Sequence, residues 1–206
     1  MSGIIAQNVG RHAGLIKAPS GGGAWTLIQT LTSDGSDSDL SFTSGIDSTY
    51  DEYVFVLNNI HPETDNKNLQ FNLSDDGGSS YAVTKTSTTW YATHDEGDAG
   101  GEAYIHYEAG GDLAQGTGAQ RMSLSGGTGA DNDQSWSGYL HLYAPSDTTF
   151  VKNFMFTGVH SVASDYATNV FGAGYGNTTS AIDAIQFTMT ADEIQGGSIS
   201  MYGIGR

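Results

Sequence analysis

Residues 182–204 read IDAIQFTMTADEIQGGSISMYGI, and this stretch decides the fold class. Ile185, Phe187 and Met189 alternate with polar residues, which is the period of a strand with one apolar face and one polar face. The same alternation returns at residues 199–202. The adjacent glycines of ADEIQGG favour a turn between the two segments, because glycine readily adopts a positive φ. We therefore predict a closing hairpin whose partner strands come earlier in the chain.

Strand patterns of this kind recur from Trp25 onward. About a dozen short segments of strand character are separated by clusters of Gly, Asp, Asn and Ser. Residues 69–73 have one apolar face, whereas residues 51–60 (DEYVFVLNNI) form a continuous apolar run, typical of a strand covered on both faces. No segment shows a sustained helical period. The sequence predicts an all-β fold, an antiparallel β-sandwich that is jelly-roll-like.

Composition sets the broad class of protein. The chain has 206 residues, 37% of them hydrophobic and 11% aromatic, which is enough for one large packed domain. It contains no cysteine, so disulfides and thiolate metal sites are excluded. No apolar run approaches the roughly 18 residues of a membrane-spanning helix, and no signal-peptide pattern precedes the first charges. We expect synthesis and assembly in a cytoplasm and no membrane partner.

The charge of the chain is unevenly distributed. The net charge is −16, but residues 1–33 contain Arg11 and Lys17 and no acid, so the remainder carries −18. A surface this acidic repels nucleic acid phosphates, so we expect no nucleic-acid partner. It suits solubility, a salty medium or divalent cations, and a solvated acidic surface without a partner is the simplest interpretation.

The first 23 residues differ from the rest. Their apolar residues follow no sustained period, and Pro19 with residues 21–23 (GGG) ends the segment as a flexible joint. We divide the chain into an extended N-terminal arm, residues 1–23, and one β-sandwich domain, residues 24–206. The arm is either a partly disordered terminus or an arm that docks on a neighbouring subunit. Docking would bury Ile4, Ile5, Leu15 and Ile16.

Three acidic clusters are candidates for a metal site. Carboxylate oxygens suit Ca²⁺, and an added imidazole such as His94 suits a transition metal. The spacing of these residues does not match the known calcium-loop pattern. Asx residues that shape their own turns are the simpler interpretation, so calcium is an alternative and we predict no cofactor. The candidate ligands are Asp75, Asp76, Asp95, Asp98, Asp131 and Asp133.

No catalytic motif is present in the sequence. It has no G-x-S-x-G, no P-loop, no H-E-x-x-H and no cysteine nucleophile. Its 23 acidic residues offer many carboxylate pairs for glycoside hydrolysis, but nothing singles out one of them. We therefore predict that the protein is not an enzyme and has no catalytic residues.

Aromatic residues on several expected strands suggest a contact surface. In residues 136–143 one set of alternate positions carries Trp and Leu. The other set is therefore expected to form an outward row of Tyr, His and Tyr. Residues 149–160 carry large side chains at both parities, which suggests that both faces of that strand are covered. Aromatic packing within one sheet is the alternative. The predicted subunit-contact residues are Tyr104, His106, Tyr139, His141 and Tyr143.

The chain resembles the β-sandwich virion proteins of tailed bacteriophages, especially those of marine phages. The resemblance rests on residues 51–62 (DEYVFVLNNIHP), 71–81 (FNLSDDGGSSY), 132–135 (NDQS) and 185–204, and on the arm end GLIKAPSGGGAWTLI. It covers nearly the whole chain, and its motifs indicate a fold and a setting but no chemistry.

The resemblance implies a structural role in a virion that is assembled in the host cytoplasm. It favours a capsid decoration or cement protein that associates with itself, as a homotrimer or otherwise a homodimer, and with other virion proteins such as a major capsid protein. The alternative is a tail or fibre module that binds a receptor glycan, with Trp90, Tyr91 or Tyr139 stacked on sugar rings. A glycan-degrading enzyme is a further alternative.

Overall fold

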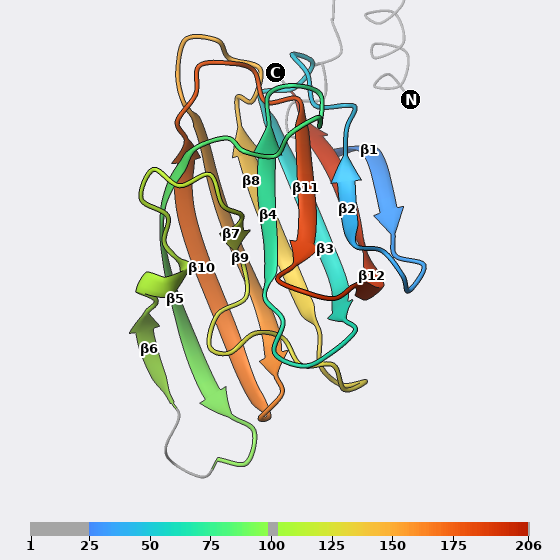
Figure 1. Cartoon of the computed structure of the whole chain (residues 1–206), viewed down its shortest axis with the longest axis vertical. Coiled ribbons are helices and arrows are strands. Elements are labelled where there is room, and N and C mark those ends of the chain that lie inside the picture. The colour runs from blue at the N-terminus through green and yellow to red at the C-terminus, as the bar shows by residue number, and fades with distance from the viewer. Residues whose placement is uncertain (1–24, 99–102, 206) are drawn as a thin grey trace, which may run out of the picture.

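The computed structural model describes residues 25–98 and 103–205, and these residues form strands almost throughout (Figure 1). The predicted arm, with Ile4, Ile5, Leu15 and Ile16, lies outside the described residues. The only helical element within them is a short 3-10 helix, η1 (Ala109–Gly111). The strands are β1 (Trp25–Thr32), β2 (Asp39–Phe42), β3 (Glu52–Pro62), β4 (Leu69–Ser74), β5 (Lys85–Asp95), β6 (Tyr104–Tyr107), β7 (Gln120–Arg121), β8 (Trp136–Tyr143), β9 (Lys152–Val162), β10 (Tyr166–Gly176), β11 (Ala184–Met189) and β12 (Ile194–Ile204).

The strands form two antiparallel sheets that pack face to face. The large sheet has the order β1-β12-β3-β8-β9-β10-β5-β6, and the small sheet has the order β2-β11-β4-β7. The part β1-β12-β3-β8 together with the small sheet has the strand order of an eight-stranded jelly roll. The pairs β5–β6 and β9–β10 extend the large sheet beyond β8 (Figure 1). The predicted all-β sandwich is therefore confirmed.

The closing stretch is not the hairpin that its sequence predicts. β11 pairs with β2 and β4 in the small sheet, whereas β12 pairs with β1 and β3 in the large sheet. The chain crosses between the sheets at residues 190–193, before the two glycines. Gly197 lies inside β12 at a register shift, with φ 102°, and a Cβ there would meet the Asn59 carbonyl oxygen at 2.3 Å. The glycines therefore serve a β-bulge and not a turn.

The core lies between the two sheets and is rich in aromatic rings. Phe71 and Phe187, from the small sheet, are in direct register with each other and fully buried. The ring of Phe71 also packs edge-on against Phe154 of the large sheet, with centroids 5.2 Å apart. Trp136 is fully buried, and its indole N–H donates to the Met122 carbonyl at 3.0 Å. The inward parities predicted for residues 69–73, 136–143 and 185–189 are confirmed.

Three basic side chains are also buried in the interior. Lys85 and Lys152 are fully buried and flank Gly176 on one rung of the large sheet, in the order β5-β10-β9. His160 is buried on β9, and burial lowers its pKa to about 4 because the charged imidazolium loses its hydration there. Neither lysine was expected in the interior from the sequence pattern, since charged residues usually stay at the surface.

Candidate functional site

The most distinctive surface of the protein is the side of the large sheet that faces away from the small sheet. We call this surface the outer face. Strand alternation and cross-strand register determine its members, because residues paired across neighbouring strands point to the same side of the sheet. Its large apolar side chains are Trp25, Leu27, Trp90, Ile105, Tyr107, Tyr139, Met155, Val159 and Phe171.

Several of these side chains are exposed to an extent that is unusual for their type. Val159 is 50% exposed, Met155 is 46% exposed and Ile105 is 75% exposed. They come from the two added strand pairs, β9–β10 and β5–β6, which continue past the eight strands of the jelly roll. Contiguous apolar surface on a soluble protein usually marks a contact site. The added strands thus contribute much of the exposed apolar surface of the outer face.

Aromatic rings on the outer face form two clusters. At one side, Trp25 reaches across the sheet to Tyr139, edge-on with centroids 6.3 Å apart, and also contacts Tyr202 at 5.6 Å. At the other side, Trp90 stacks on Phe171 with centroids 4.3 Å apart and an interplanar angle of 12°. Hollows of about 320 Å³ and 200 Å³ lie beside Tyr139 and beside Trp90 respectively.

The outer face is almost free of charge although the chain carries −16. Lys152 is the only residue of β8, β9 and β10 with a formal charge, and its side chain points inward and is buried. On β3, Glu52 pairs with His141 of β8, with the carboxylate 2.6 Å from Nδ1. The carboxylates are therefore concentrated at loops and edges, and the middle of this face can approach another surface without bringing acids together.

The five predicted subunit-contact residues divide between two faces. Tyr139, His141 and Tyr143 form the expected outward row on β8. Tyr104 and His106 lie on the other side of the large sheet, since His106 is in register with the inward Tyr91 and its ring lies 5.3 Å from the Tyr91 ring. The sequence gives no sign of this division, because residues 104–107 (YIHY) carry large side chains at every position, so their alternation does not show which set faces outward.

Strand β9 is not covered on both faces, contrary to the expectation from its sequence. Phe154 and Phe156 point into the core, and this fixes Met155 and Val159 on the exposed side. The sequence carried no signal for this placement, because large side chains occupy both sets of alternate positions and only the structure shows which set is buried. Phe171, Trp25 and Leu27 also belong to the outer face and were not predicted as contact residues.

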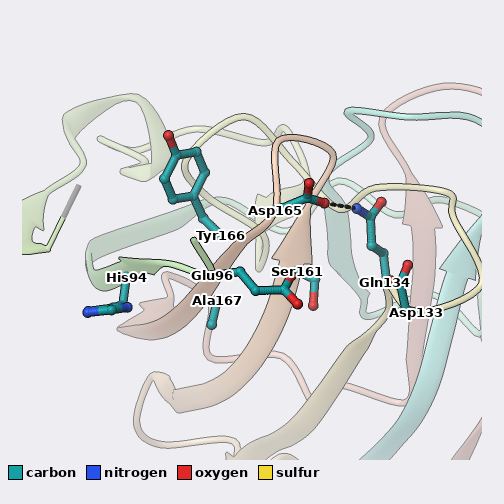
Figure 2. Close-up of a pocket in the computed structure, with 8 residues that line it drawn as sticks. All are labelled: His94, Glu96, Asp133, Gln134, Ser161, Asp165, Tyr166 and Ala167. Atoms are coloured by element: carbon teal, nitrogen blue, oxygen red, sulfur yellow. Dashed lines mark hydrogen bonds between the residues drawn. The ribbon is translucent and has the colours of Figure 1, made fainter. Parts of the chain in front are cut away.

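A second candidate site is a polar cavity of about 330 Å³ at one end of the sandwich (Figure 2). It lies where the end of β5, the β9–β10 turn and the loop before β8 meet. Gln134 donates to Asp165 at 3.2 Å and to the Val162 carbonyl at 3.2 Å. The remaining side chains that line it are His94, Glu96, Asp133, Ser161, Tyr166 and Ala167.

The acidic clusters form turns in the described structure. Asp76 accepts hydrogen bonds from the Ser80 N–H and the Ser74 hydroxyl, and these lower its pKa. Asp95 accepts from the Gly97 N–H at 2.9 Å. No group of three or more His, Asp or Glu side chains within residues 25–98 and 103–205 is placed to hold a metal ion. Figure 2 shows His94 pointing away from the carboxylates of the polar cavity.

Comparisons with protein families, with curated proteins and with solved structures found no match to this chain. Within its described part, no helix is long and apolar enough to cross a membrane.

Proposed function

We propose that this protein is a structural component of a bacteriophage virion, a capsid decoration or cement protein that works as a homo-oligomer and contacts other virion proteins. The outer face is the main support for this proposal, because a broad apolar surface with almost no charge suits a permanent contact in an acidic protein. The jelly-roll sandwich and the resemblance of the sequence to phage virion proteins agree with this role. Immunogold labelling of intact particles tests it, and particles without bound label would contradict it.

Self-association through the outer face is testable by adding one charge to it. Val159→Glu is expected to weaken the oligomer about 100-fold or more, since a buried carboxylate without a partner costs several kcal/mol. Gln186→Glu is the matched control, because it adds the same charge on β11 of the small sheet. Sedimentation velocity over a concentration series measures both. A wild-type protein that stays monomeric at high concentration, together with isolated copies in the particle, would refute the proposed contact.

The N-terminal arm supplies the anchor in this proposal. Its charge of +2 opposes the −18 of the rest, and burying each of its four large aliphatic side chains is worth roughly 1.5–3 kcal/mol. The ordering cost of ~1–2 kcal/mol per residue requires backbone hydrogen bonds as well, and strand addition on another subunit provides them. Deletion of residues 2–20 is expected to leave the melting temperature nearly unchanged and to abolish incorporation into particles. Normal occupancy of the truncated protein would exclude the arm as anchor.

A glycan-binding role is the second candidate, and the environment of Trp90 favours it. The ring is held by Phe171, remains 39% exposed and lies in register with Tyr107, which is 60% exposed. Rigid exposed aromatic rings are suited to stacking on sugars. A glycan array with the purified protein tests this role, with Trp90→Ala as the variant that is expected to lose the signal. Signal that survives this substitution would place any glycan elsewhere.

A further inference from the structure

Lys85 and Asn72 form a buried contact that joins the two sheets. Lys85 lies on β5 of the large sheet and Asn72 lies on β4 of the small sheet. The Lys85 ammonium nitrogen, Nζ, donates to Asn72 Oδ1 and to the Val83 carbonyl, the second at 2.8 Å. None of the ion pairs found among the described residues involves Lys85, so its polar partners are neutral. A buried cation with only neutral partners is costly.

Burial favours the uncharged form of this amine. Desolvation lowers the pKa of Lys85 from 10.5 to about 8. At neutral pH roughly a tenth of the side chains are then unprotonated, and the fraction grows steeply above pH 8. The unprotonated amine has a free electron pair and is a nucleophile, as in enzymes that use desolvated lysines.

The side-chain amide of Asn72 is held on both sides of its carbonyl carbon. Oδ1 accepts a hydrogen bond from the Leu73 N–H at 3.0 Å, in addition to the one from Lys85. Nδ2 donates to the Thr117 carbonyl at 3.0 Å and to the Tyr81 carbonyl. Donors at the oxygen stabilise the negative charge that develops there during nucleophilic attack. Carbonyl oxygens at the nitrogen stabilise the positive charge on a departing amine.

We propose that Lys85 and Asn72 join in an intramolecular isopeptide bond that links the two sheets covalently. The bond from Lys85 Nζ to Asn72 Cγ forms, and the bond from Cγ to Nδ2 breaks. One proton moves from the attacking amine to the departing nitrogen, which leaves as ammonia. The reaction needs no oxidant, no reductant and no further reactant, because amine and amide exchange within one chain.

Fixed proximity is expected to accelerate this reaction. The two groups are held in contact by separate strands. Reactions between groups held in this way are much faster than the same reaction between free molecules in solution. Asparagine loses ammonia in proteins when a backbone amide nitrogen attacks the same carbon, and an unprotonated amine is a better nucleophile than an amide. In a chain without cysteine, such a bond would tie β4 to β5 where a disulfide is impossible.

Lys152 provides a matched comparison within the same structure. It is also fully buried on the other side of Gly176, but its only hydrogen-bond acceptors among the described residues are the carbonyl oxygens of Phe150 and Thr178. It is therefore a buried lysine like Lys85, although its ammonium contacts are only partly buried, and it has no side-chain amide to attack. A chemical change that depends on the Asn72 contact should occur at Lys85 and not at Lys152.

Intact-mass spectrometry of the purified full-length protein, held for several days above pH 8, tests the proposal. The expected mass is lower than the sequence mass by one ammonia. Because Asn72 and Lys85 both lie between the tryptic sites at Lys67 and Arg121, digestion should give one peptide of residues 68–121 that is closed into an internal loop between the two residues, with no cleavage after Lys85. Lys85→Met and Asn72→Ala should each show no deficit relative to their own sequences, whereas Lys152→Met should retain it. A wild-type protein of full sequence mass after this incubation overturns the proposal, and so does a deficit located at another residue.

Discussion

Replacing Phe71 by alanine is expected to lower the free energy of unfolding by about 3–5 kcal/mol. The ring is fully buried at the meeting point of the two sheets. It contacts Phe154 at 5.2 Å, Phe156 at 6.3 Å and Phe187 at 6.4 Å between centroids. Its removal leaves a cavity that these rings cannot fill, because each is held in its own strand. Urea unfolding followed by tryptophan fluorescence measures the change.

Phe150→Ala is the matched control for this measurement. The same side chain is lost, but Phe150 is 69% exposed and lies outside the core. Its replacement is expected to change the free energy of unfolding by no more than about 0.5 kcal/mol. If Phe71→Ala cost less than about 1 kcal/mol, the packing described for the two sheets would be wrong.

Acid is expected to destabilise the fold through His160. The imidazole is buried, its Nδ1 has no hydrogen-bond partner in the described structure, and its pKa is lowered from 6.5 to about 4 because burial penalises the charged form. Between these two pH values the unfolded chain binds a proton that the folded chain does not bind. Stability is therefore unaffected above about pH 6.5 and falls as the pH drops toward 4. At about 1.4 kcal/mol for each pH unit, the loss approaches 3 kcal/mol.

The His160→Gln variant separates this effect from the titration of carboxylates. Glutamine is neutral throughout and can accept the hydrogen bond that the Leu124 N–H donates to His160 Nε2 at 3.4 Å. The difference in unfolding free energy between wild type and variant should change by about 3 kcal/mol between pH 7 and pH 4. His94→Gln is the control, because that side chain is 61% exposed. A difference that does not vary with pH would mean that His160 is hydrated in the folded state.

The sequence correctly predicted the features that a single strand determines, such as which side of the strand faces the core. The inward parities of residues 69–73, 136–143 and 185–189 follow from alternation alone, because each strand carries its core residues on one side. The outward Tyr139, His141 and Tyr143 row followed in the same way. Prediction failed for the closing stretch, because two adjacent glycines serve a β-bulge as readily as a turn.

The residues that distinguish this protein could be found only in the assembled sandwich. Lys85 and Asn72 are 13 residues apart in the sequence, and only the packing of the two sheets brings an amine against an amide in a dry interior. His160 alternates with core residues in β9, but its sequence does not show that its Nδ1 lacks a partner. Burial of a polar group depends on neighbours from several strands, so no local pattern reports it.

The sequence by itself determined that the chain is an acidic, cysteine-free, all-β sandwich, because strand period, turn residues and composition are local properties. The tertiary structure decided which strands share a sheet, and hence that the pairs β5–β6 and β9–β10 extend the large sheet into the outer face. Alternation gives each strand two faces, but it does not show which of the two faces the opposite sheet will cover. That choice is made when distant strands pair, because the free energy of burying apolar surface is gained only between the faces that meet.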